Sequence, residues 1–234
     1  MASNDWVQRV YDQVWPGLRR FIDAARTAVM APWAQYKGMP DPSGAHRAAP
    51  VWSAEVARLL PLLAQVSEAA AADIGAGRMA TEGMVLREQA RTANLLTRIP
   101  DEIAGDLFDL IDQGQRAGMS TERIAAQVDA YLDVTGSQRW PGRAMAIART
   151  ETARAWNVGW LAANMQVRPA ATKTWDTDLD GDERAAHHAA NGQTVPMGMP
   201  FTVGDEYLMY PGDVTASAEN VVNCRCEMSV RAGG

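Results

Sequence analysis

Four residues near the C-terminal end of the chain have side chains that bind soft metal ions: His187, His188, Cys224 and Cys226. The chain contains no other cysteine, and a single residue separates Cys224 from Cys226. Zinc prefers thiolate and imidazole ligands, so these residues could form a zinc site. Adjacent residues point in different directions, and we therefore expect one of the two histidines to take part.

Two other interpretations of the same residues stay open. In the first, two buried thiols and one imidazole form a hydrogen-bonded cluster without a metal. In the second, His187, His188 and the two cysteines form the centre of a zinc-dependent hydrolase or nuclease, which would need an open coordination position and a nearby base. The sequence shows no base at a fixed spacing from them. It therefore assigns no cofactor other than a candidate structural zinc.

The segment Asp176–Asp182 resembles the first half of a calcium-binding loop, because aspartates alternate along it and Gly181 permits a sharp turn. Position twelve of such a loop requires a bidentate glutamate, and here it is His187. Position eight is normally apolar, and here it is Glu183. The pattern thus predicts a solvated acidic loop rather than a calcium site.

Composition limits the classes of function. The chain has 234 residues, of which 47% are hydrophobic, and a formal net charge of −6. This is typical of a globular protein, and the acidic balance argues against a dedicated nucleic-acid binder, whose affinity depends on a cationic surplus. The longest uncharged stretch, Ala185–Val203, is interrupted by glycine and proline, so we expect no contact with a membrane.

Apolar residues recur every three or four positions up to about residue 166, which predicts helices. The expected helices cover residues 6–21, 51–74, 81–99, 101–114, 120–132 and 144–165. Proline and glycine in the segment Tyr36–Pro50 predict a loop. Pro100 is expected to end the third helix and Asp101 to cap the fourth.

After Pro169 the helical period is lost, and short candidate strands alternate with turn residues. The expected strands are residues 172–175, 193–195, 207–210 and 221–230. The predicted fold class is therefore α+β, with a helical N-terminal region followed by a small, loop-rich α+β C-terminal module. Trp156 and Trp160 are expected to cover this module as part of its core.

Several short motifs follow one another in the C-terminal half. The segment Ile147–Asn157 contains the sequence Ala-Arg-Thr-Glu-Thr, and Asn223–Cys226 reads Asn-Cys-Arg-Cys. Between them lie Lys173-Thr-Trp, Arg184-Ala-Ala-His and Tyr210-Pro-Gly-Asp. This series resembles the Mu F-like head morphogenesis family, the minor head proteins of tailed bacteriophages.

The resemblance covers about residues 100–230 and implies two regions. Residues 1–100 would be a helical region that docks on the portal or the capsid. Residues 101–234 would be the Mu F-like module, with helices in 101–166 and strands and loops in 167–234. The four tryptophans of the first region are candidate anchors for the docking contact: Trp6, Trp15, Trp33 and Trp52. Burial of these rings in the core of the helical region is an equal alternative.

The resemblance also implies which residues have structural roles. They are Arg149, Glu151, Arg154, Arg184 and Asn223. Glu151 and Arg154 are expected to be at least partly buried and to connect their helix to the strands. The family carries one histidine together with the two cysteines, so His187 is preferred over His188 as their neighbour in space.

The function implied by the resemblance is that of a low-copy minor capsid protein, without enzyme activity, that supports head assembly and DNA packaging or delivery. Its expected partners are the portal protein, the major capsid protein, or both, with contact to packaged DNA as a further expectation. The expected location is the virion head near the portal vertex, after assembly in the host cytoplasm.

Overall fold

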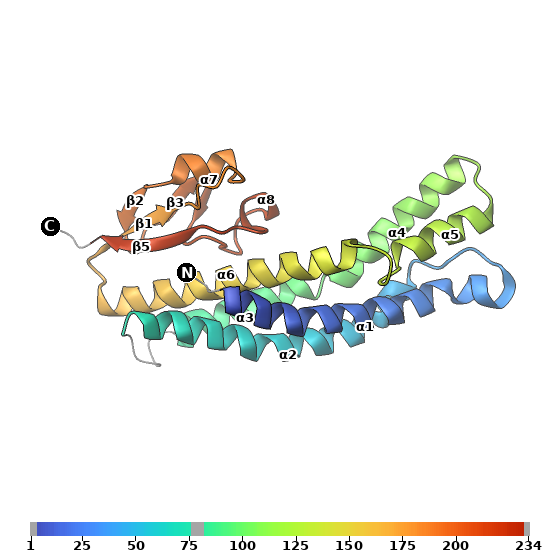
Figure 1. The fold of residues 1–234 in the computed structure, drawn as a ribbon, viewed down its shortest axis with the longest axis horizontal. Helices are drawn as coiled ribbons and strands as arrows, with labels where there is room; N and C mark the ends of the chain where they lie inside the picture. The colour runs from blue at the N-terminus through green and yellow to red at the C-terminus, as the bar shows by residue number, and fades with distance from the viewer. Residues whose placement is uncertain (1–3, 76–81, 232–234) are drawn as a thin grey trace. The chain divides into compact units, whose positions relative to one another are not determined.

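The computed structural model describes residues 4–75 and 82–231, and it has the expected α+β fold class. The helices of the described residues are α1 (Asn4–Tyr36), α2 (Gly44–Asp73), α3 (Glu82–Leu96), α4 (Ile99–Arg116), α5 (Thr121–Tyr131), α6 (Arg139–Val167), α7 (Ala185–Ala190) and α8 (Ala218–Val221). The strands are β1 (Thr172–Asp176), β2 (Thr194–Pro196), β3 (Phe201–Val203), β4 (Glu206–Leu208) and β5 (Glu227–Arg231). Figure 1 shows the path of the chain through these elements.

The chain forms two compact units that are not consecutive in sequence. The helical unit comprises Gln13–Leu59 and Ala93–Ala144. The strand unit comprises Met1–Asp12, Leu60–Thr92 and Met145–Gly234. The long helices α1, α2 and α6 each contribute residues to both units, so each unit draws on distant parts of the sequence.

Trp52 lies at the centre of the helical unit. Its side chain is 1% exposed, its ring centroid is 6.1 Å from that of Phe21, and its Nε1 donates a 2.6 Å hydrogen bond to the carbonyl of Leu96. The expectation that Trp52 could anchor a partner is therefore wrong, because its ring and its donor are both used inside the fold. Trp15 and Trp33 are only half-buried.

The expected loop Tyr36–Pro50 is shorter than its proline and glycine content predicts, because α2 already begins at Gly44. Asp41 accepts hydrogen bonds from the backbone nitrogen and the hydroxyl of Ser43, which organises the turn before the helix. A Cβ on Gly44 would lie 2.4 Å from the backbone nitrogen of Val29. Here glycine permits close packing of two helices rather than breaking one.

The sequence predicts that Pro100 ends a helix, and this prediction is wrong. Helix α3 ends at Leu96, and Pro100 lies in the first turn of α4. Proline fits there because the first backbone nitrogens of a helix have no carbonyl partner within it. The residue preceding α4 is Arg98, so Asp101 belongs to the first turn rather than to the cap position.

The strand unit contains a three-stranded antiparallel sheet in the order β2-β1-β5 and a separate β3-β4 hairpin. In the register of β1 with β5, Trp175 pairs with Met228. The core of the unit includes Trp160 and Trp175 and has Trp156 packed at its edge, which confirms the role expected for the tryptophans of α6. The predicted strand over residues 221–230 is wrong in its first half, where α8 ends and an irregular segment follows.

Candidate functional site

His187, Cys224 and Cys226 lie together in the strand unit, although 36 residues separate His187 from Cys224 in the sequence. The Nδ1 atom of His187 is 3.3 Å from the sulfur of Cys226 and 3.7 Å from the sulfur of Cys224. The three side chains are buried, and their ligand atoms all lie within 4.8 Å of one another. The expected proximity is confirmed. His188 is exposed and does not belong to this group, so the preference for His187 is also borne out in space.

Helix α6 holds the cysteine segment in place through polar side chains. The amide nitrogen of Asn157 donates hydrogen bonds to the carbonyls of Cys226, at 3.2 Å, and Pro211, at 3.1 Å. The hydroxyl of Thr150 accepts a 3.0 Å hydrogen bond from the backbone nitrogen of Asn223. Asn223 has a φ of 56°, and asparagine tolerates this left-handed conformation better than most residues do. The Asn-Cys-Arg-Cys motif thus begins with a turn that α6 fixes.

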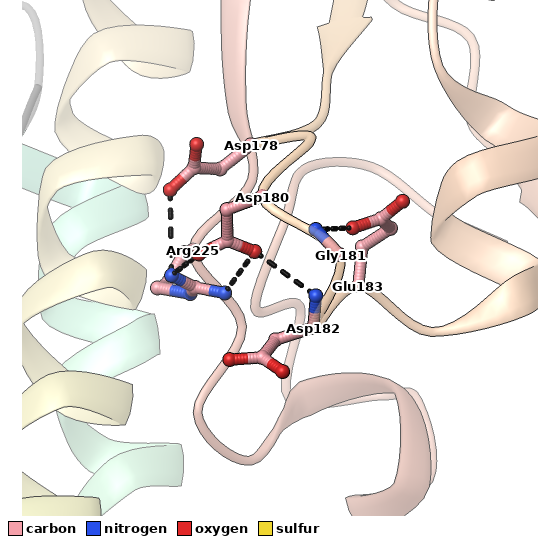
Figure 2. Close-up of polar contacts among 6 residues, drawn as sticks. All are labelled: Asp178, Asp180, Gly181, Asp182, Glu183 and Arg225. Atoms are coloured by element: carbon pink, nitrogen blue, oxygen red, sulfur yellow. Dashed lines mark hydrogen bonds and ion pairs between the residues drawn. The ribbon is translucent and has the colours of Figure 1, made fainter.

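Arg225 lies between the two cysteines and is held by the acidic loop. Its guanidinium forms ion pairs with Asp180, at 2.8 Å for the Nη2–Oδ1 contact, and with Asp178 at 3.4 Å (Figure 2). These neighbours raise the pKa of Arg225, first through the hydrogen bond to Asp180. The loop turns at Gly181, whose φ is 92°. Two carboxylates of the loop, those of Asp178 and Asp180, therefore bind a cation of the protein itself.

The histidine is held from the other side by strand β1 and the residue after it. Trp175 packs edge-to-face against the His187 ring, with ring centroids 5.7 Å apart. The hydroxyl of Thr177 donates a 2.8 Å hydrogen bond to the carbonyl of His187 and lies 3.7 Å from the sulfur of Cys226. Arg184, at the start of α7, donates to the carbonyl of Val222. These contacts thus fix both segments that carry the cluster, α7 and the residues before β5.

The cluster favours a negative charge on one sulfur. The hydrogen bond from Cys224, with smaller contributions from His187 and Thr177, lowers the pKa of Cys226 to about 5. The hydrogen bond to Cys226 and burial raise the pKa of Cys224 well above its ordinary value. Both effects favour deprotonation of Cys226 over deprotonation of Cys224. A buried thiolate beside imidazole can bind a soft cation, donate electrons to an oxidant, or accept a proton.

A cleft of about 1050 Å³ borders this cluster, and all of its lining residues belong to the strand unit. Cys224 and Cys226 line it together with the exposed Arg149, the half-buried Arg184 and the acidic loop. Both signs of charge therefore meet at the cleft, and the sulfurs lie at its wall.

Glu151 and Arg154 form a buried ion pair, as the family resemblance implies, whereas their i, i+3 spacing alone is typical of a surface pair. Their side chains are 6% and 4% exposed, and the Nη1–Oε2 distance is 2.5 Å. The Nε of Arg154 donates a 2.8 Å hydrogen bond to the carbonyl of Gly212, and Glu151 accepts one from the hydroxyl of Thr92. Burial raises the pKa of Glu151, and Arg154 opposes this effect. The pair connects α6 to the segment before α8 and to α3.

A second set of buried polar residues has no role predicted from the sequence, and Lys173 is its first member. The Nζ of Lys173 donates a 2.6 Å hydrogen bond to the carbonyl of Met209, and burial lowers the pKa of this lysine to about 8. Burial raises the pKa of Glu88, which is hydrogen-bonded to Tyr210. Asp213 accepts from the backbone nitrogen of Met209 at 2.9 Å. Lys173 and the Tyr-Pro-Gly-Asp segment belong to the motif series that carries the family resemblance. Their place in that series was the feature of the sequence that could have indicated a structural role.

Comparison with known protein families places the arrangement in context. The sequence model of the family described as "Phage Mu protein F like protein" matches residues 101–229. No curated protein and no solved structure gives a significant match to the chain. The match includes α6, the acidic loop and all three residues of the His–Cys cluster.

Proposed function

Because the chain belongs to the phage Mu protein F like family, we propose that it is a minor capsid protein that acts at the portal vertex during head morphogenesis. The family is a structural family of the phage head, which supports a role in the virion rather than a catalytic one. In this role the protein is present in few copies, contacts the portal or the major capsid protein, and supports DNA packaging or delivery.

The observation that best supports this proposal is that the motif residues of α6 bind other parts of the same chain. Glu151, Arg154 and Asn157 are buried, and their polar atoms bind other parts of the same chain. A catalytic motif presents reactive groups to a substrate, whereas these groups hold a helix to a loop-rich module. The motif therefore maintains a shape, which is what an assembly protein requires.

Among the described residues, no helix is long and apolar enough to cross a membrane. The charge of the chain agrees with the proposal. The net charge of −6 gives the chain little general affinity for phosphates, so it would not compete for the DNA being packaged.

The zinc hydrolase alternative receives less support. Its centre would need a base close to the metal, and no carboxylate of residues 4–75 and 82–231 joins His187, Cys224 and Cys226 in their group. His188, which the alternative would also use, is exposed.

The portal contact can be tested with two matched aromatic substitutions. Tyr36, at the end of α1, is 69% exposed, and Tyr207, in β4, is 71% exposed. If residues 1–100 make the contact, Tyr36→Ala should reduce co-purification of the portal protein of the same phage about tenfold, because exposed aromatic anchors contribute strongly to interfaces. Tyr207→Ala should leave it unchanged. Equal recovery of the portal protein with both variants would contradict docking through this part of the chain.

Substitutions are preferable to deletion of the N-terminal segment. Leu18, Phe21 and Ile22 of α1 have no exposed surface and belong to the core of the helical unit. Removing residues 1–50 would therefore remove part of that core, and a failure to enter heads could reflect loss of folding. A chain without residues 1–50 is therefore not expected to fold normally.

A further inference from the structure

We propose that His187, Cys224 and Cys226 bind one Zn²⁺ ion through Nδ1 and the two sulfur atoms, and that this ion cross-links α7 to the segment before β5. This goes beyond the proposed role in head morphogenesis, since it concerns how the strand unit is held together.

The distances between the donor atoms fit a tetrahedral zinc site. Zinc–sulfur bonds of about 2.3 Å and zinc–nitrogen bonds of about 2.0–2.1 Å place a sulfur and a nitrogen ligand about 3.5 Å apart, and two sulfur ligands about 3.8 Å apart. The nitrogen–sulfur distances of His187 are 3.3 Å and 3.7 Å. All three ligand atoms already lie within 4.8 Å of one another, so small side-chain rotations suffice to complete the geometry.

A metal ion satisfies this cluster better than hydrogen bonds alone. The single Nδ1 atom of His187 faces two sulfur atoms, but one ring proton can be shared well with only one of them. All three side chains are buried, so a metal-free cluster depends mainly on the hydrogen bonds among them. A divalent cation contacts all three donors at once and balances the negative charge of thiolate ligands.

The surrounding contacts arrange the cysteines before any metal arrives. In an extended segment, residues two apart face the same side and the residue between them faces the other side. Arg225 accordingly reaches away to Asp178 and Asp180, while Cys224 and Cys226 both face His187. The acidic loop thereby positions the two sulfurs through Arg225, in addition to the hydrogen bond from Asn157.

The donor set leaves one position of the ion for a solvent molecule. Zinc takes four ligands, the group supplies three, and both cysteines line the cleft of about 1050 Å³ from which water can reach the ion. The main consequence of the site is stability, because it joins two segments of a loop-rich module.

The first test measures metal content in the full chain. The protein is purified under reducing conditions without chelator and analysed by elemental mass spectrometry, with about one zinc per chain as the expected result. Replacement of zinc by Co²⁺ should give the visible bands of tetrahedral cobalt and a near-ultraviolet thiolate charge-transfer band. Cys226→Ser and His187→Ala should lose both signals, while His188→Ala, which changes an exposed neighbour, should keep them.

The second test uses wild-type protein only, so it does not depend on whether the variants fold. Chelation should lower the melting temperature, and added Zn²⁺ should restore it. At a free zinc concentration about a thousandfold above the Kd, the shift should be roughly 8–16 °C for a chain of this size. Reduced wild-type protein that binds neither Zn²⁺ nor Co²⁺ would overturn the proposal in favour of a metal-free cluster. Full zinc retention by Cys226→Ser would also overturn it.

Discussion

Removal of Glu151 tests whether the buried pair holds the strand unit together. In Glu151→Ala, the guanidinium of Arg154 keeps its 2.8 Å hydrogen bond to the carbonyl of Gly212 but loses its counterion while only 4% exposed. Breaking a buried ion pair from one side costs about 3–5 kcal/mol, because the remaining charge stays buried. For a chain of this size this corresponds to a fall in melting temperature of roughly 6–20 °C.

Calorimetry of three variants separates the pair from the individual residues. Glu151→Ala and Arg154→Met should each destabilise strongly, whereas the double variant should lose less than the sum of the two, because neither charge is then left alone. The control is Arg116→Ala, which removes an exposed pair with Asp112 whose side chains are 79% and 52% exposed. That change should cost only about 0.5 kcal/mol or less.

The expected loss of stability depends on burial of the pair. If Glu151→Ala melts within a degree of the wild type, the pair behaves like the exposed one. Additive effects of Glu151→Ala and Arg154→Met would likewise show that the two side chains do not act together.

Three other predictions concern separate features of the strand unit and of α6. Burial raises the pKa of Glu88. The contribution of this side chain to stability is therefore present below its unfolded pKa of about 4.3 and is lost as the pH rises through the folded pKa. Because glutamine does not titrate, the melting temperature of Glu88→Gln relative to wild type should rise between pH 5 and pH 8. A Cβ on Gly159 would lie 2.3 Å from the carbonyl oxygen of Ser67, so Gly159→Ala should cost about 1–3 kcal/mol in thermal unfolding, whereas Gly142→Ala, which meets nothing within 4 Å, should stabilise by about 1 kcal/mol or less. Arg225→Ala should weaken zinc binding about 10–100-fold in competition with a chromophoric chelator, and unchanged affinity would show that the acidic loop does not position the sulfurs.

The helices were predictable because their apolar residues repeat over many turns, but their ends were not. Gly44 and Pro100 both look like helix breakers in the sequence, yet each lies in a first turn. At Gly44 the decisive fact is the approach of α1, which no local pattern reveals. Helix α7 was missed because six residues are too few to show a helical period.

The residues of the candidate site were predictable from the sequence, but the contacts that position them were not. The types of His187, Cys224 and Cys226 indicated a shared site, and the family resemblance favoured His187 over its neighbour. The roles of Asn157 and Arg225 could not be predicted, because they depend on contacts made across 69 residues in one case and 45 in the other. Lys173 was also missed, since an isolated lysine in a short strand looks exposed until the β3-β4 hairpin and its following segment cover it.

The proposed role in the head is best tested by quantitative mass spectrometry of purified heads from the phage that encodes this chain, combined with cross-linking. We expect a few copies of the chain per particle, far fewer than of the major capsid protein, with cross-links to the portal protein. Absence of the chain from both immature and mature heads, together with normal assembly when its gene is deleted, would contradict a structural role in the head.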